Sequence, residues 1–209
     1  LARGTRISIQ NLFFNTPARL KFLKSKETEF SHIASWIESI ALSRPDIGFT
    51  LRNNSKTELF ARPQTEARER IREILGVDIA EFLHPVAGRR GQLSVSGFVA
   101  DHRASGSSPK SLFFFVNGRI VRDRTLQHAV LSAYENLMMK HRYPWAVLYL
   151  DVPPEFVDVN VHPTKSEVRF VNGSLVHEMV REGVRAALES GRGVSPPVPA
   201  ELAHPSEPM

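Results

Sequence analysis

One lysine near the carboxyl-terminal end of the sequence lies in a pattern suited to binding a phosphate group. The stretch 157–170, VDVNVHPTKSEVRF, starts with the alternation of a β-strand and breaks at His162-Pro163-Thr164, because Pro163 cannot donate to a strand ladder. Alternation resumes after Lys165, so we expect its ammonium at the tip of a strand–turn–strand unit. Such a compact charge suits a phosphate, and an ordinary solvated loop lysine is the alternative.

Arginines follow a predicted tight turn at Asn117-Gly118. Three of them are close together: Arg119, Arg122 and Arg124. Positive side chains on one face can contact nucleic-acid phosphates, so these residues are candidate DNA contacts. Other loops could add three further arginines: Arg89, Arg90 and Arg103. The alternative is a solvated helix start with a local ion pair to Asp123, which contributes little to stability.

The excess positive charge lies in the first part of the sequence. The net charge of the whole chain is +5, and residues 1–62 carry 10 Lys and Arg against 5 Asp and Glu, whereas residues 63–209 carry 17 of each. A basic run in the first part consists of Arg19, Lys21, Lys24 and Lys26. A basic face attracts nucleic acid or an acidic partner, but a solvated helix face is the favoured interpretation of this run.

The composition argues against several other kinds of site. The chain of 209 residues has no Cys, and its 8 His show no metal-ligand spacing, so we predict no metal site. His162 is expected to fix its turn by hydrogen bonding, and His32 and His128 to be packing or surface residues on helices. No apolar run is long enough to cross a membrane, and we expect no signal peptide. Because the chain starts with Leu and a predicted strand, we expect a piece of a longer protein.

The first 62 residues predict a small group of elements. Thr5–Leu12 alternates like a strand, and Asn15-Thr16-Pro17 is typical of a helix start. A longer helix is expected over Glu29–Ser43, ended by Pro45, and a hairpin over 47–61 turns at Asn53-Asn54. Residues 62–65 are then a predicted domain junction.

The second part predicts a sheet with helices on one face. The expected helices cover 65–75, 124–139 and 172–188, and the expected strands cover 82–86, 92–100, 111–116 and 145–152. Residues 88–91 are expected to join two of these strands, and 102–109 to form a flexible loop. The order places the chain in the α+β class, with a two-layer arrangement of sheet and helices. After residue 191 the Pro- and Ser-rich tail predicts a disordered linker.

Three stretches in order resemble signatures of the MutL family of DNA mismatch repair proteins. They are GTRISIQNLFFNTPAR from residue 4, FVNGRIVRD from residue 115 and VDVNVHPTKSEVRF from residue 157, and the resemblance covers about residues 3–190. It implies the end of a GHKL-type α/β ATPase sandwich in residues 1–62. It further implies a transducer domain of split β-α-β, gyrase-B second-domain type in residues 63–190, followed by a linker in 191–209.

The resemblance also implies a composite nucleotide site. Lys165 would be the catalytic residue that reaches the terminal phosphate of ATP, and Thr5 would help to hold the adenine. The family's Mg²⁺-binding Asn and Glu, its Asp-x-Gly-x-Gly and its Gly-rich lid do not occur in this sequence. ATP and Mg²⁺ are therefore expected in the intact protein, and the chain alone, although part of an ATPase, is expected to be inactive.

The implied function is to couple ATP binding and hydrolysis to DNA and to partner proteins. The implied partners are MutS-type mismatch-recognition proteins, an endonuclease, a helicase and a second copy in a homodimer, in the bacterial cytoplasm and at the nucleoid during repair. One alternative is the transducer region of a type II topoisomerase B subunit. The other is a stand-alone basic module that binds nucleic acid without a nucleotide.

Overall fold

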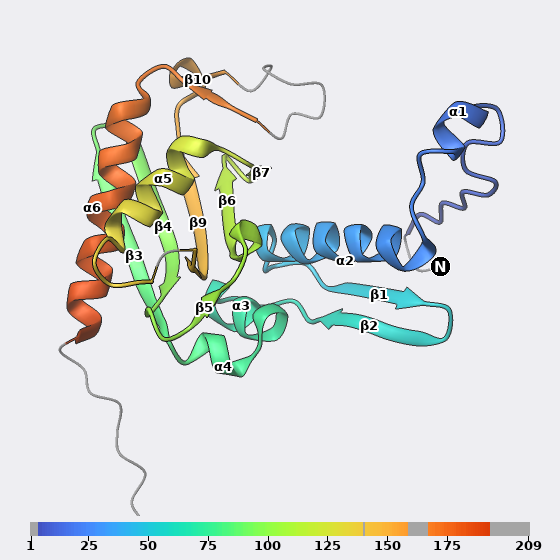
Figure 1. Cartoon of the computed structure of the whole chain (residues 1–209), viewed down its shortest axis with the longest axis horizontal. Helices are drawn as coiled ribbons and strands as arrows, with labels where there is room; N and C mark the ends of the chain where they lie inside the picture. Colours follow the sequence, from blue (N-terminus) through green and yellow to red (C-terminus); the bar gives the residue numbers. More distant parts are fainter. Residues whose placement is uncertain (1–3, 140, 159–166, 193–209) are drawn as a thin grey trace, which may run out of the picture.

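A five-stranded mixed sheet forms the centre of the computed structural model, which describes residues 4–139, 141–158 and 167–192 (Figure 1). Its strands, in spatial order, are β3 (Leu83–Arg90), β4 (Leu93–Ala100), β9 (Ala146–Asp151), β6 (Leu112–Val116) and β7 (Arg119–Val121). β6 and β9 run parallel, and the other neighbours run antiparallel. A sheet flanked by helices confirms the expected α+β class.

Two helices cover one face of this sheet, as expected (Figure 1). They are α5 (Arg124–Ala133) and α6 (Gly173–Arg192). Alternation in the strands decides which side chains meet them: Phe114 of β6 and Leu148 of β9 are buried in the same core as Leu126 and Val180 of the helices. This core is the larger of the two that sandwich the sheet.

The opposite face is covered by three further helices. They are α3 (Ala67–Leu75), α4 (Val77–Ala80) and the end of α2 (Lys26–Ser43). Leu42 and Ile71 from these helices pack with Phe115 and Val147 of the sheet, and the ring of Phe115 stacks on Tyr149 at 5.2 Å. The sheet is therefore buried on both sides, and its second layer comes from residues that precede it in the sequence.

The amino-terminal part extends away from the sheet along α2 (Figure 1). Its other elements are α1 (Pro17–Leu20) and the hairpin of β1 (Phe49–Asn53) and β2 (Lys56–Ala61). The predicted hairpin is confirmed, with Asn54 at a φ of 55° in the turn. The predicted long helix starts earlier than expected, because Ser25 caps it by accepting a hydrogen bond from the amide of Thr28 at 3.3 Å.

The predicted strand over Thr5–Leu12 is wrong. Among the described residues, no strand pairs with this segment, and its alternating apolar side chains are open to solvent: Ile7 is 80% and Ile9 is 77% exposed. A strand requires the backbone groups of a neighbour, and alternation alone does not supply them.

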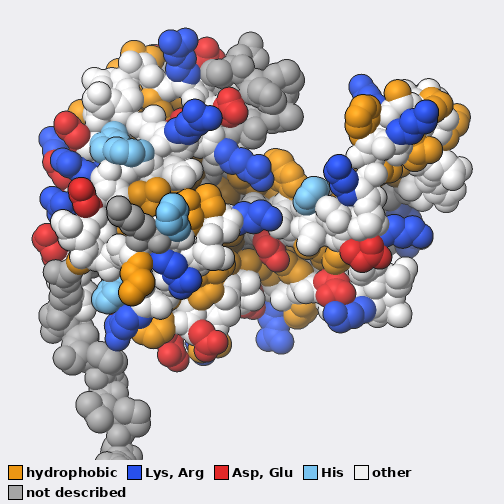
Figure 2. All heavy atoms as spheres, in the orientation of Figure 1, with side chains coloured by type: hydrophobic (Ala, Val, Ile, Leu, Met, Phe, Trp, Pro, Cys, Tyr) orange, Lys and Arg blue, Asp and Glu red, His pale blue; other side chains and the backbone are white. Residues whose placement is uncertain are grey.

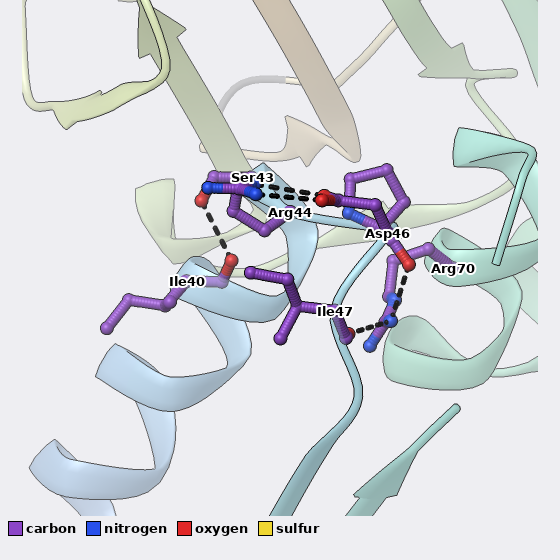
Figure 3. A network of polar contacts seen from close by, with 7 residues as sticks. Ile40, Ser43, Arg44, Asp46, Ile47 and Arg70 are labelled. Carbon is purple, nitrogen blue, oxygen red and sulfur yellow. Dashed lines mark hydrogen bonds and ion pairs between the residues drawn. The ribbon is translucent and has the colours of Figure 1, made fainter. Parts of the chain in front are cut away.

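A buried arginine joins the hairpin and α2 to the sheet (Figure 3). The Nη2 atom of Arg70, in α3, lies within hydrogen-bond distance of three backbone oxygens, those of Pro45 at 2.9 Å, Ile47 at 2.6 Å and Arg62 at 2.6 Å. Its side chain is 0% exposed, and burial lowers the pKa of Arg70, against the opposing charges of Glu73 and Asp46. Arg70, which follows the predicted junction at 62–65, thus bonds back to the chain that precedes the junction and to its first residue.

Three other expectations need correction. β3 continues through the predicted 88–91 connection, and the turn lies at Gly91, where φ is 59°. The predicted loop over 102–109 contains β5 (Ser105–Gly106), which pairs with β8 (Tyr143–Pro144). The helix expected over 124–139 ends at Ala133, because Tyr134 leaves the helical conformation, with a ψ of 5°, and Asn136 has a positive φ of 67°. None of the helices in the described ranges is both long and apolar enough to cross a membrane.

Candidate functional site

The turn between β6 and β7 is tied firmly to the end of β9. Asn117 and Gly118 have φ values of 50° and 74°, which matches the predicted Asn-Gly turn. The side chain of Asn117 donates to the carbonyl of Val152 at 2.7 Å and accepts from the amide of Val152 at 2.9 Å. Its backbone amide also donates to Leu150 at 2.9 Å. The residues that follow therefore start from a fixed point.

This turn presents the three predicted arginines to solvent. Arg119 is exposed at the start of β7, Arg122 follows β7, and Arg124 is the first residue of α5. None of them has an ion pair with an acidic side chain in the part of the chain that the structure describes. Asp123 caps α5 instead, by accepting from the amide of Leu126 at 2.9 Å. The three guanidinium groups are thus available to a phosphate-bearing ligand.

Arg89 and Arg90 are not neighbours of that turn. They end β3, which is one edge strand of the sheet, whereas Arg119 starts the other edge strand, β7. Both places are at the same end of the sheet, four strand intervals apart, which is about 19 Å at about 4.8 Å per interval. Arg90 is also bound to Glu182 of α6 at 2.5 Å, and that hydrogen bond raises the pKa of Arg90. Their DNA contact remains a prediction, and it would need a ligand that spans the sheet edge to edge.

Arg103 lies at the opposite end of the sheet. It follows the end of β4, where Ala100 pairs with Leu83. Its Nε donates to Asp101 at 3.1 Å, and its guanidinium carbon is 4.8 Å from the centre of the Phe82 ring. The structure therefore does not bring Arg103 together with Arg119, and this predicted DNA contact also stays untested.

The ends of the predicted strand–turn–strand unit are confirmed, but its tip lies outside the described residues. β10 (Val157–Asp158) pairs antiparallel with β11 (Arg169–Phe170). Val157, Val168 and Phe170 are buried in the core shared by α5 and α6. Lys165, like His162, belongs to residues 159–166, of which the structure gives no description. The pair β10–β11 fixes where that stretch leaves and rejoins the fold.

Thr5, the other residue assigned to nucleotide binding, does not lie beside this pair. It is exposed in the segment before α1, and Figure 1 shows this amino-terminal part on the far side of α2 from the sheet. The described residues contain no group of three His, Cys, Asp or Glu that could hold a metal ion. The second basic run, from Arg19 to Lys26, is exposed in the same outlying region.

A pair of histidines was not foreseen as a unit. His128 of α5 and His177 of α6 meet with Nδ1 and Nε2 at 2.8 Å. They line an open hollow at the starts of both helices, together with Arg124, Thr125, Gly173, Ser174 and Glu178. Figure 2 shows histidine side chains on the surface where α5 and α6 meet, with basic side chains nearby. Each histidine lies four positions after a helix start, but only the packing of the two helices brings them together.

Comparison with known proteins gives a consistent result. The family model described as "DNA mismatch repair protein, C-terminal domain" matches residues 71–189. A DNA mismatch repair protein MutL from Citrifermentans bemidjiense is 42% identical over 99% of this chain and 32% of its own length. One from Geotalea daltonii is 47% identical over 91% of this chain and 32% of its own length. The chain thus spans about a third of these relatives.

Solved structures share the fold at lower identity. The N-terminal domain of a DNA repair protein has a TM-score of 0.72 and 21% identity, and the match covers 88% of this chain and 61% of that one. The Aquifex aeolicus MutL ATPase domain complexed with ADP has a TM-score of 0.55 and 22% identity, over 81% of this chain and 55% of that one. These likenesses support the α+β architecture described above.

Proposed function

The chain belongs to the MutL family of DNA mismatch repair proteins, and we propose that it couples ATP binding and hydrolysis to contact with DNA and partner proteins. One observation carries the proposal: the turn before Arg119 is bonded to Val152, close to where the chain enters β10. A predicted DNA contact and the predicted nucleotide loop thus share one anchor. The relatives at 42% and 47% identity are mismatch repair proteins, which disfavours a topoisomerase subunit or a stand-alone basic module.

DNA would bind through phosphate contacts with Arg119, Arg122 and Arg124. All three are exposed, without acidic partners among the described residues, so binding a phosphate displaces no ion pair. Such contacts give salt-dependent binding without base specificity. Arg89, Arg90 and Arg103 would contribute only to a ligand that extends across the sheet.

The test is the double variant Arg119→Glu with Arg124→Glu, measured against random duplexes at several salt concentrations. We expect weaker binding to all duplexes and a log–log salt slope that is smaller by about 0.9 for each lost contact. The control, Arg52→Glu with Lys56→Glu, makes the same charge change on the exposed hairpin. Equal loss of affinity in both variants would show that net charge alone explains the effect and would contradict the proposed DNA contacts.

Lys165 is proposed to sense the terminal phosphate of ATP in the intact protein, with Thr5 helping to hold the adenine. A charge-assisted bond to phosphate contributes about 1.5–3 kcal/mol, so Lys165→Ala should slow ATP turnover roughly tenfold to a hundredfold. ADP affinity should change little, because ADP lacks that phosphate, and Lys165→Arg should fail because it lacks the compact shape. Unchanged turnover of the full-length variant would remove Lys165 from the mechanism.

The chain alone is expected to hydrolyse no ATP, because the Asn and Glu with which the family binds Mg²⁺ and water do not occur in its sequence. Turnover by this chain above that of its Lys165→Ala variant would contradict the proposal. We further propose that residues 1–62 belong to the ATPase domain, 63–190 form the transducer domain and 191–209 a linker. MutS-type proteins, an endonuclease, a helicase and a second copy are the proposed partners, in the cytoplasm and at the nucleoid.

A further inference from the structure

His128 of α5 and His177 of α6 meet head on. The Nδ1 of His128 lies 2.8 Å from the Nε2 of His177, and the ring centroids are 5.1 Å apart. That centroid separation is close to the largest that two imidazoles joined by such a contact can have. The two ring nitrogens therefore point at each other, and a proton on either one lies between both rings.

The surroundings of His177 favour its neutral form. From α5 the pair faces Arg124 and the hydroxyl of Ser132, which is 3.4 Å from the Nδ1 of His128. From α6 it faces Glu178 and Arg181. Burial lowers the pKa of His177 below its ordinary value, and His128 and Arg181 lower it further against the opposing effect of Glu178.

The number of protons on the four ring nitrogens decides whether the contact between the histidines can persist. A neutral pair has one N–H in the contact, one outward N–H and one outward lone pair, whichever tautomer is present. One added proton occupies the outward lone pair, so the contact is kept and both outward nitrogens become donors. A second added proton would set N–H against N–H and break the contact. The pair can therefore bind one proton while α5 and α6 stay joined.

Without this added proton, the side chains that line the hollow carry little net charge. Arg124 and Glu178 line it together, so their charges offset each other. A single proton on the histidines would make the lining positive and would add a second outward N–H donor. A phosphodiester oxyanion is the ligand that such a lining fits.

We propose that the hollow is a proton-linked phosphate site, in which Arg124 and the outward N–H of one histidine of the pair bind one DNA phosphate as the pair takes up one proton. The inference rests on the proposed contact between Arg124 and DNA. It adds two residues and a pH dependence to that contact.

Linkage sets the sign of the effect. Bound phosphate stabilises the charged pair, so the pair has a higher pKa with DNA than without it. Affinity for DNA rises as the pH falls through the pKa of the bound state and levels off below the pKa of the free state. Between the two values, uptake of one proton strengthens binding by about tenfold per pH unit.

The experiment measures the affinity of this chain for a random duplex at low salt, from about pH 8.5 to about pH 5.5. The variants are His128→Gln, His177→Gln and both together, because glutamine keeps a polar amide but takes up no proton. The control is His32→Gln, a change of the same type on the exposed surface of α2. Thermal midpoints at neutral pH establish that each variant is folded.

We expect the double variant to lose about one proton of linkage relative to wild type and to the His32→Gln control. Each single variant should lose no more than the double variant, because one imidazole that can take up a proton remains. Wild-type pH dependence in the double variant would overturn the inference, even if Arg119→Glu with Arg124→Glu still weakens binding as the proposed function requires.

Absence of DNA binding by wild type at every pH would instead contradict the proposed function. The pair is then tested by itself, by following the titration of both imidazoles in NMR spectra with and without inorganic phosphate. A phosphate-dependent rise of their shared pKa, absent for His32, would support the site. An unchanged pKa would overturn it.

Discussion

The sheet region and the amino-terminal region of this chain treat their apolar side chains in opposite ways. In β6 and β9, apolar residues follow one another and are buried on both faces of the sheet, and Phe115 and Leu148 are almost fully removed from solvent. In residues 4–15, where apolar and polar residues alternate, Ile7 and Ile9 are mostly exposed, and Phe14 and the indole of Trp36 in α2 are also open to solvent. An apolar pattern therefore marks a surface that can be buried, and the burial itself depends on a partner surface.

The largest effect should separate the two regions directly. Leu148→Ala removes a fully buried side chain from the middle of the sheet, which should cost about 2–5 kcal/mol of unfolding free energy. Ile9→Ala removes a side chain that is 77% exposed, and it should change stability by less than about 0.5 kcal/mol. Urea unfolding of both variants is the measurement. A similar loss in both would mean that residues 4–15 are packed in solution.

The second effect concerns the junction of the two regions. Arg70→Leu removes the donor to three backbone oxygens, and we expect a loss of about 1–3 kcal/mol because water can reach these oxygens once the junction loosens. Hydrogen exchange should rise in β1 and β2 while β9 stays protected. Arg72→Leu, an exposed position on the same helix, is the matched control and should leave exchange unchanged. Equal loosening of β9 would show that Arg70 supports the whole fold and not the junction.

A smaller effect should follow pH at a second contact between the regions. The hydroxyl of Tyr149 donates to the carbonyl of Leu42 at 2.8 Å, and burial raises the pKa of Tyr149 to about 12. The pKa of this phenol is about 10 in the unfolded chain and is raised in the fold. The stabilisation by the neutral phenol is therefore complete below about pH 10 and is lost as the pH rises from there toward 12.

The comparison with Tyr149→Phe isolates this contribution. The phenylalanine variant should be less stable by about 1 kcal/mol at neutral pH, because it lacks the hydrogen bond. By about pH 11 the wild type should have lost about 1.4 kcal/mol relative to the variant, so its advantage should be gone. A gap that stays constant with pH would show that the phenol is not buried against α2.

The smallest effect should come from an ion pair at the edge of the sheet region. Arg90 and Glu182 are 2.5 Å apart, but their side chains are 44% and 52% exposed. Solvent and salt screen such pairs, so Arg90→Gln should leave the thermal midpoint unchanged within error. A clear drop at low salt that disappears at high salt would show that this edge depends on the pair.

Local signals predicted the elements whose determinants lie close together in sequence. The Asn117-Gly118 turn and the end of α3 at Gly76 follow from residues that tolerate a positive φ, and both are confirmed. The hairpin at Asn54 was predicted in the same way. The start of α2 was placed too late, because the cap at Ser25 lies before the apolar stripe on which the prediction depended.

Features that depend on tertiary packing could not be predicted from the sequence. The segment Thr5–Leu12, expected to be a strand, has no pairing strand among the described residues. Arg90 and Arg119 lie on opposite edge strands because of the order of the strands in the sheet. His128 and His177 are 49 positions apart, and no local pattern relates them. The Lys165 loop was assigned through its motif, and the structure confirms only the paired strands at its base.

The place of β9 in the sheet has a consequence for the order in which the chain can fold. β3 with β4, and β6 with β7, are hairpins made of neighbouring segments, and each can form as soon as it is synthesised. β9 pairs with β4 on one side and β6 on the other, both far earlier in the sequence. During synthesis the two hairpins must therefore wait for residue 151 to emerge before one sheet can close. Until then, the inner edges of both hairpins remain unpaired and exposed to whatever binds nascent chains.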